Sequence, residues 1–183
     1  ARLENGARKS LTYNELFDQV SECAAGLRQL GVVSGDRVAG FMPNIPETIV
    51  AMLATASIGA IWSSCSPDFG INGVMDRFGQ IEPKVLFGCD GYFYNGKTID
   101  TLPRLKAICS KIESIEQLVV VPVIQDAVAI DGFGNAVLFH DFLSAHRGAA
   151  LFCEQLPFNH PLYIMYSSGT TGAPKCIVHS AGG

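Results

Sequence analysis

The chain has 183 residues, which is enough for one domain with a sizeable core and too few for two. Hydrophobic residues make up 48% of the chain and charged residues only 16%, a balance that excludes an intrinsically disordered protein. The net charge of -4 provides no excess of basic residues, so the composition argues against nucleic acid or an anionic membrane as a partner.

The first predicted helix runs from Thr12 to Leu30. Thr12 and Glu15 have the spacing of a capping box, in which the threonine side chain accepts a hydrogen bond from a first-turn amide. Gly31 then ends the pattern, as glycine commonly does after a helix. The apolar residues that recur at helical spacing are Leu16, Val20, Leu27 and Leu30.

Strands and helices then alternate along the chain. The uncharged run 48–67 is long enough for a membrane span, but Gly59 and Pro67 interrupt it, so we expect a buried helix followed by a strand. Repeated units of this kind with apolar strands predict an α/β fold, a mainly parallel sheet flanked by helices. The predicted strands are 37–42, 60–64, 85–88 and 118–121, and the predicted helices are 46–58, 71–80 and 102–112.

The pattern after Pro122 is less regular. Residues 127–130 and 136–139, joined by an Asp-Gly-Phe-Gly-Asn segment, are interpreted as a hairpin. Residues 162–166 predict a further strand, which leads through a polar loop into another strand at 176–178.

That polar loop, from Ser167 to Lys175, is dense in groups that bind phosphate. Its glycines permit positive φ and a close approach of the backbone to a ligand, its hydroxyls can donate to phosphate oxygens, and its lysine adds a positive charge. It is not a Walker A loop, because a proline precedes the lysine and a strand follows it. The alternative is a serine-rich surface hairpin without a ligand. The residues concerned are Ser167, Ser168, Gly169, Thr170, Thr171, Gly172 and Lys175.

The run from Tyr166 to Lys175 resembles the signature loop of the adenylate-forming superfamily, which includes the acyl-CoA synthetases. The following residues, 179–183, are similar to the acetyl-CoA synthetase branch. The runs 62–70 and 76–87 are similar to the branch that activates acetoacetate. The resemblance covers nearly the whole chain and a quarter to a third of the length of such enzymes.

The resemblance implies a two-step reaction, in which ATP and acetoacetate give an acyl-adenylate and coenzyme A then displaces AMP to form the thioester. ATP, Mg²⁺ and coenzyme A are therefore the implied cofactors and co-substrates. The loop residues Ser167, Ser168, Gly169 and Gly172 would bind the phosphates together with Thr170, Thr171 and Lys175. The last three would also stabilise the departing pyrophosphate, so they are the implied catalytic residues.

Two alternatives to an acetoacetate ligase stay open. The chain could come from an acetyl- or propionyl-CoA synthetase, or from a non-catalytic product that binds nucleotide. The chain begins at Ala1 without a methionine and stops at Gly183, just after the loop. We therefore expect residues 1–183 to be a partial N-terminal domain, truncated at both ends and inactive alone, because the implied adenine and acyl contacts lie beyond Gly183.

Lys97 is a further candidate, because it resembles a basic position that contacts the nucleotide phosphate of coenzyme A. The alternative is a solvated lysine in a turn, since exposed lysines are the rule. Trp62, which stands among small residues, is predicted to be a packing anchor.

Three other patterns are interpreted as structural. Gly132-x-Gly134 lacks the third glycine of a dinucleotide fingerprint and precedes a strand. His140 and Asp141 are expected to point to opposite faces of an extended segment, and His179 is expected to be hydrogen-bonded without an acid–base role.

The six cysteines show no C-x-x-C pair, and several stand in apolar runs. This spacing is typical of free buried thiols and not of a disulfide framework or a zinc site. The four histidines show no ligand spacing either, so we expect no metal centre. Free thiols favour a reducing compartment, and we expect the cytosol. The cysteines are Cys23, Cys65, Cys89, Cys109, Cys153 and Cys176.

Overall fold

The computed structural model describes residues 1, 3–167 and 172–183. The strands of this part are β1 (Arg37–Phe41), β2 (Ile61–Cys65), β3 (Val85–Cys89), β4 (Gly91–Tyr94), β5 (Lys97–Asp100), β6 (Gln117–Val121), β7 (Ala136–Leu138), β8 (Pro161–Ser167) and β9 (Lys175–Ser180). The helices are α1 (Tyr13–Gln29), α2 (Pro46–Ser57), α3 (Ile71–Ile81), α4 (Leu102–Lys111) and α5 (Phe139–Ser144).

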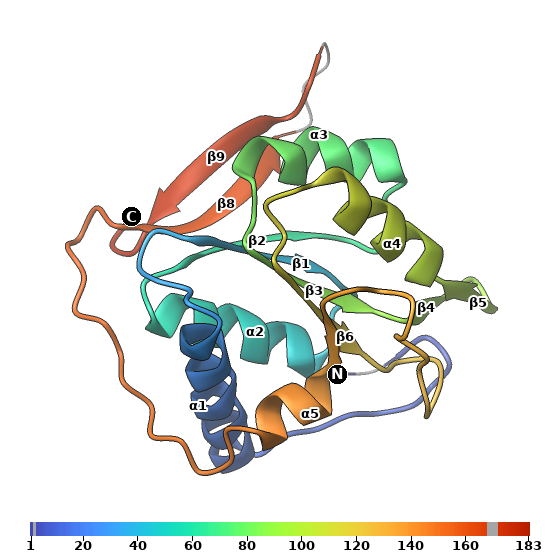
Figure 1. Ribbon diagram of the computed structural model, residues 1–183, viewed down its shortest axis with the longest axis horizontal. Coiled ribbons are helices and arrows are strands. Elements are labelled where there is room, and N and C mark those ends of the chain that lie inside the picture. The colour runs from blue at the N-terminus through green and yellow to red at the C-terminus, as the bar shows by residue number, and fades with distance from the viewer. Residues whose placement is uncertain (2, 168–171) are drawn as a thin grey trace.

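Within the described residues, seven strands form one twisted sheet in the order β7-β6-β3-β1-β2-β8-β9 (Figure 1). All neighbours pair in parallel except β8 and β9, which are antiparallel. Strands β4 and β5 form a separate antiparallel hairpin. The predicted α/β fold with a mainly parallel sheet is therefore confirmed.

Helices cover both faces of this sheet. Helices α1, α2 and α5 lie on one face, and α3 and α4 lie on the other (Figure 1). The central strands alternate accordingly, since Val38 belongs to the core under α1 and α2 whereas Ala39 belongs to the core under α3 and α4. This two-sided burial explains why the strands read as continuous apolar runs.

Helix α1 begins as the sequence predicts. The Thr12 side chain accepts a hydrogen bond from the Glu15 amide over 3.2 Å, and the Glu15 carboxylate accepts one from the Thr12 amide over 2.7 Å. The uncharged run 48–67 folds as most of α2 followed by β2, as expected. Among the described residues, no helix is long and apolar enough to cross a membrane.

The predicted hairpin at 127–130 and 136–139 is wrong. Residues 127–130 form no strand, and β7 pairs in parallel with β6. Asn135 fixes this arrangement, because its carbonyl accepts from the Leu118 amide over 2.9 Å and its side chain donates to the Glu116 carbonyl over 3.1 Å. The parallel pairing extends the main sheet and covers the edge of β6, which a local hairpin would leave open.

Two further elements were not predicted. The β4–β5 hairpin turns at Asn95 and Gly96, whose φ values of 49° and 70° are those of a tight hairpin turn that favours Asn-Gly. Helix α5 follows β7 directly, and its Phe142 packs against α1. This contact requires Gly26, where a Cβ atom would lie 2.5 Å from the Phe142 ring.

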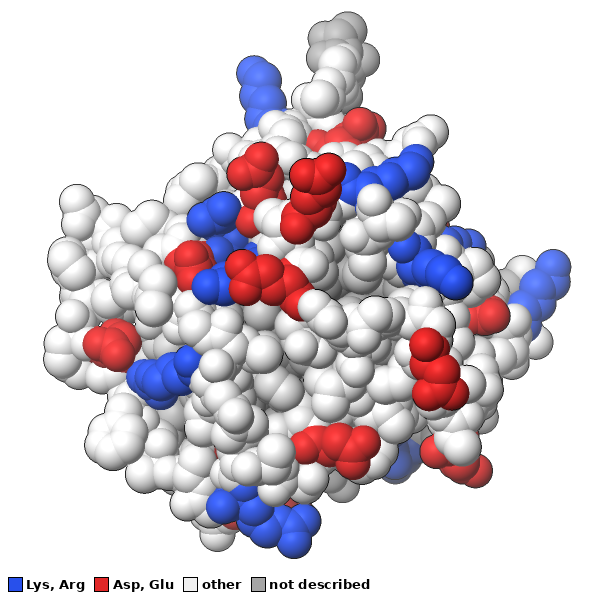
Figure 2. Space-filling view, viewed as in Figure 1, with Lys and Arg blue, Asp and Glu red and all other residues white. Residues whose placement is uncertain are grey.

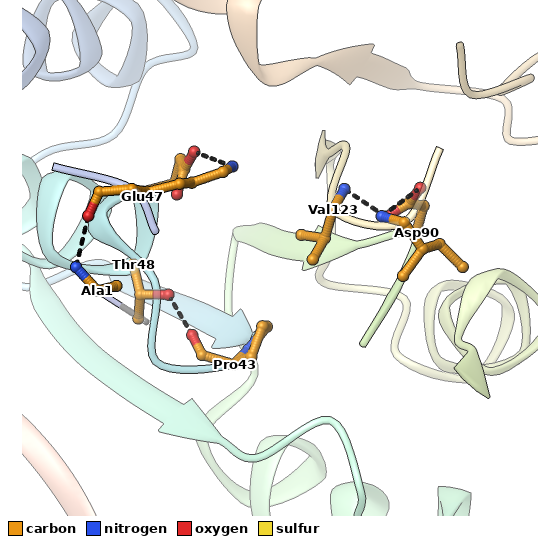
Figure 3. Close-up of polar contacts among 8 residues, drawn as sticks. Ala1, Pro43, Glu47, Thr48, Asp90 and Val123 are labelled. Carbon is orange, nitrogen blue, oxygen red and sulfur yellow. Dashed lines mark hydrogen bonds and ion pairs between the residues drawn. The ribbon is translucent and has the colours of Figure 1, made fainter. Parts of the chain in front are cut away.

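A buried carboxylate joins two of these irregular segments. Asp90 follows β3 and is fully buried. Its oxygens accept hydrogen bonds from the amides of Val123 (2.6 Å), Ile124 (3.1 Å) and Gln125 (3.0 Å), as Figure 3 shows for Val123. Asp90 therefore holds the chain where it leaves β6, and backbone donors satisfy its buried oxygens.

We predict that Asp90→Asn lowers the free energy of unfolding by about 1–3 kcal/mol, because the new amide group faces a backbone N–H that then has no acceptor. Urea denaturation measures the change. The exposed Asp131 provides the control, since Asp131→Asn should change stability by less than about 0.5 kcal/mol. Equal effects of the two substitutions would contradict the assigned role of Asp90.

Candidate nucleotide-binding site

The candidate site lies at the carboxyl ends of β1, β2 and β8. Helix α2 follows β1 on one face of the sheet, whereas α3 follows β2 on the other face (Figure 1). In open α/β sheets, a ligand crevice forms where neighbouring strands connect to opposite faces. The gap between β1 and β2 is such a point, and the polar loop leaves the same edge of the sheet from β8.

A cavity of about 580 Å³ opens where β2 and β8 separate. The two strands pair only at Trp62 with Tyr163 and at Ser63 with Ile164, and beyond these residues they diverge. The cavity is lined by Met52, Trp62, Ser64, Cys65, Ser66, Phe69, Arg77, Tyr163, Ile164, Met165 and Tyr166. Another cavity, of about 380 Å³, lies at the opposite edge of the sheet beside the start of β6.

Arg77 brings a positive charge to the 580 Å³ cavity. It extends from α3 with its guanidinium carbon 4.4 Å from the centroid of the Phe69 ring and 5.6 Å from that of Tyr166. Its Nη1 donates to the Gly73 carbonyl over 2.7 Å. The guanidinium is thus held by two rings and a carbonyl of its own helix.

Tyr166 joins this group to the sheet. Its hydroxyl lies 2.8 Å from the hydroxyl oxygen of Ser63, which in turn lies 2.9 Å from the Ile164 carbonyl. Burial raises the pKa of Tyr166 above its ordinary value of 10.0, so the hydroxyl stays protonated and acts as a hydrogen-bonding group.

The predicted loop connects β8 to β9. The ladder pairs Ser167 with Lys175, so these two candidate residues stand side by side at the base of the loop. Gly172 has a φ of 96°, in the left-handed region that favours glycine, and Lys175 is exposed. Ser168, Gly169, Thr170 and Thr171 lie outside the described residues.

Lys97, the remaining candidate, is not part of this group. It is exposed at the start of β5 on the β4–β5 hairpin. That hairpin projects from the side of the molecule in Figure 1, whereas the end of the β8–β9 ribbon projects from the top. Figure 2 shows acidic and basic side chains interspersed on this face of the protein, which agrees with a net charge of -4.

Cys65 lies between two cavities and is the cysteine closest to the candidate site. It lines the 580 Å³ cavity and a neighbouring one of about 310 Å³ beside the β4–β5 hairpin. Burial raises the pKa of its thiol to about 12, although the Arg77 charge opposes the shift. A thiol that stays protonated at neutral pH is a poor nucleophile. Burial therefore disfavours Cys65 as a nucleophile.

All six cysteines are free, with Cys153 exposed. The described residues contain no group of three or more His, Cys, Asp or Glu side chains placed to hold a metal ion.

Trp62 is a packing anchor as predicted. It is buried against Gly40, where a Cβ atom would lie 2.6 Å from the indole ring, and near Phe87 with ring centroids 6.4 Å apart.

The prediction for His140 and Asp141 is wrong in its geometry. Both residues lie on helix α5 and not on an extended segment, so their side chains meet, with Nε2 3.1 Å from Oδ1. Both are exposed and neither lines the candidate cavity.

His179 on β9 lies near Tyr163, with ring centroids 5.4 Å apart. Gly132 and Gly134 lie in a turn and do not open a helix.

Sequence reasoning missed Arg77, Ser63 and the role of Tyr166. Arg77 and Tyr166 are far apart in sequence and meet only because α3 packs beside β8. The signal that was available is the single basic residue of α3, but it does not reveal the ring that the guanidinium contacts.

Residues 2–183 match the protein family described as AMP-binding enzyme. The chain belongs to this family. Among the relatives of this chain, the acetoacetyl-coenzyme A synthetase of Rhizobium meliloti (strain 1021) is 52% identical over 183 residues, which are 100% of this chain and 28% of that protein. The acetoacetyl-CoA synthetase of Mus musculus is 50% identical over 178 residues, covering 94% of this chain and 26% of that protein.

The solved structure of the acetoacetyl-CoA synthetase from Streptomyces lividans superposes with a TM-score of 0.89 at 45% identity. The match covers 96% of this chain and 26% of that chain. The chain therefore spans about a quarter of the length of the relatives it matches.

We predict that iodoacetamide at pH 8 labels Cys153 at least about tenfold faster than Cys65 in the folded protein, because Cys153 is exposed and the Cys65 thiol is buried and protonated. Mass spectrometry of peptides after timed quenching measures both rates. Denatured protein is the control and should show similar rates for the two thiols. Equal rates in the folded state would show that Cys65 is accessible.

Proposed function

We propose that the protein containing this chain is an ATP-dependent, AMP-forming acid–thiol ligase that activates acetoacetate and transfers it to coenzyme A. The observation that carries the proposal is 52% identity over the whole chain to an acetoacetyl-coenzyme A synthetase. The position of the loop supports it, since β8 and β9 present Ser167 and Lys175 at the sheet edge where ligands bind.

In the first step, a carboxylate oxygen of acetoacetate attacks the α-phosphorus of ATP. The bond from that phosphorus to the bridging oxygen breaks, and pyrophosphate leaves with the electron pair. Ser167, Ser168, Gly169 and Gly172 bind the β- and γ-phosphates with Thr170, Thr171 and Lys175, and the last three stabilise the leaving group. Negative charge grows on the pyrophosphate in the transition state, so fixed donors and a positive charge there lower the barrier.

Mg²⁺ is proposed as a companion of ATP. The described residues provide no set of acidic or histidine side chains that fits a metal ion, so they would not hold Mg²⁺ themselves. We place the ion on the phosphates as part of the substrate, because phosphate oxygens and water are ligands that Mg²⁺ prefers.

In the second step, the thiolate of coenzyme A attacks the acyl carbon of the adenylate, and AMP leaves to give acetoacetyl-CoA. Lys97 is proposed to contact the nucleotide phosphate of coenzyme A, since its exposed ammonium on the β4–β5 hairpin can reach a bound anion. The alternative is a lysine that only faces solvent.

We also propose which part of the protein this chain represents and where in the cell the protein is found. Because the chain spans 28% of the Rhizobium relative, we propose that residues 1–183 are a partial AMP-binding domain that is inactive alone. The six free cysteines support a cytosolic location. A ligase for acetate or propionate is the alternative function, and a substrate comparison separates it from the proposed one.

We predict that Lys175→Ala in the full-length protein slows ATP–pyrophosphate exchange with acetoacetate about 100-fold or more, because it removes a charge that stabilises the leaving group. The KM for acetoacetate should change little. Lys111→Ala, which removes an exposed lysine on α4, is the control and should leave exchange unchanged. Exchange with acetate or propionate but not acetoacetate would overturn the substrate assignment, and an indifferent Lys175→Ala variant would overturn the mechanism.

We predict that Lys97→Ala raises the KM for coenzyme A about tenfold and leaves ATP–pyrophosphate exchange unchanged, because exchange needs no coenzyme A. Steady-state kinetics of thioester formation measure the first quantity. Lys106→Ala, at an exposed lysine on α4, serves as the control. An unchanged KM for coenzyme A would assign Lys97 to the solvent-facing alternative.

A further inference from the structure

Helix α3 contacts β8 and the residue that precedes β9, at the two ends of the proposed phosphate-binding loop. Arg77 places its guanidinium carbon 5.6 Å from the ring centroid of Tyr166, the penultimate residue of β8. Gln80, three residues later on the same helix, donates from Nε2 to the carbonyl of Pro174 over 3.0 Å. Pro174 directly precedes β9. Side chains three apart lie on one face of a helix, so one face of α3 reaches both ends of the loop.

These contacts occur where the backbone ladder stops. Strand β8 pairs with β2 only through Tyr163 and Ile164, so its last residues extend beyond that ladder. In that stretch Tyr166 reaches back to the Ser63 hydroxyl over 2.8 Å. The ring of Tyr166 is therefore held between Ser63 on the sheet and Arg77 on α3. Beyond the backbone hydrogen bonds to β2, contacts of the Tyr166 side chain fix the direction in which β8 runs toward the loop.

We propose that Arg77 and Gln80 are positioning residues, which fix the ends of β8 and β9 and so determine where the loop meets the departing pyrophosphate. The inference rests on the proposed function and deepens it, because it assigns to α3 the contacts that fix the two ends of the loop. Arg77 acts through Tyr166, and Gln80 acts through Pro174.

The surroundings of Arg77 favour this role over direct binding of substrate. One nitrogen already donates to the Gly73 carbonyl over 2.7 Å, and the Phe69 ring lies 4.4 Å from the guanidinium carbon. Stacking on aromatic rings is a use for which the planar guanidinium is suited. Arg77 therefore already contacts the Gly73 carbonyl and the Phe69 ring in the absence of a ligand.

The test uses the full-length protein and the variant Arg77→Met, which keeps an unbranched, flexible side chain of smaller size and removes the charge and the donors. The kcat of ATP–pyrophosphate exchange should fall roughly 10- to 100-fold, because small displacements of aligned groups cost rates of that order. The KM for acetoacetate and ATP should change less than about threefold, since no substrate contact is lost. Gln80→Met should act in the same direction.

The matched control is Arg37→Met. Arg37 also donates to carbonyls at the carboxyl end of α3, from Nε to Ile81 over 2.6 Å and from Nη2 to Glu82 over 3.0 Å, but neither of these hydrogen bonds goes to β8, to Pro174 or to β9. The control variant should lower the melting temperature and leave kcat unchanged. If it lowers kcat as much as Arg77→Met does, general destabilisation explains the result and the proposal is wrong.

A double variant tests whether Arg77 acts through Tyr166. Arg77→Met combined with Tyr166→Leu should be no slower than the slower single variant, within about twofold, because the two residues work as one unit. If the fold-losses in kcat of the two single variants multiply in the double variant, Arg77 does not act through Tyr166 and the proposal is wrong in this respect. A rise in KM for ATP or acetoacetate with kcat unchanged would make Arg77 a ligand and also overturn it.

The assay separates this inference from the proposed function. If the unmodified protein exchanges with acetate or propionate instead of acetoacetate, the substrate proposal fails, and the same variants test the positioning role with that substrate. If the unmodified protein exchanges with none of them, both proposals fail. Normal exchange with acetoacetate by Arg77→Met and Gln80→Met would end the inference alone.

Discussion

The parallel pairing of β1 with β2 on one side and β3 on the other is the constraint on which the rest of the structure depends. Strands that run in the same direction bring their carboxyl ends to one edge, and each connection must cross a face of the sheet to start the next strand. The helices therefore cover both faces, and the connections after β1 and β2 leave in opposite directions. The crevice at this edge is a consequence of the topology and not of any single residue.

The chemistry of the site follows from what that edge exposes. Burial raises the pKa of both Tyr166 and Cys65 above the ordinary value, which further disfavours ionisation of either group at neutral pH. The charge of Arg77 is engaged by aromatic rings and a carbonyl. What the described residues offer is a shaped cavity and the stems of a loop, and this arrangement suits a reaction that depends on alignment and electrostatic stabilisation.

The sequence predicted those parts of the fold that carry a strong local period. Helix α1 and the buried strands were found because capping, spacing and continuous apolar runs act within a few residues of each other. Residues 127–139 were misread because alternation of apolar residues does not distinguish a local hairpin from a strand that pairs in parallel with β6. The Asn95-Gly96 turn carried a clear hairpin signal that was left unused.

The candidate site could be proposed from the sequence only where its residues are contiguous. Ser167 and Lys175 belong to one short motif, and the structure brings them together at the base of a hairpin. The partners that hold this hairpin come from distant segments, since Ser63 lies on β2 and Arg77 on α3. Such contacts depend on which helix packs beside which strand. This packing is determined by the whole fold and cannot be predicted from a short stretch of sequence.

The short ladder between β2 and β8 has a consequence for cooperativity. With two residue pairs joining them, against five between β1 and β2, the β8–β9 ribbon is the segment of the sheet with the fewest backbone bonds to its neighbour. Ribbons of this kind open at a lower free energy than the body of the sheet, and their amides exchange with solvent sooner.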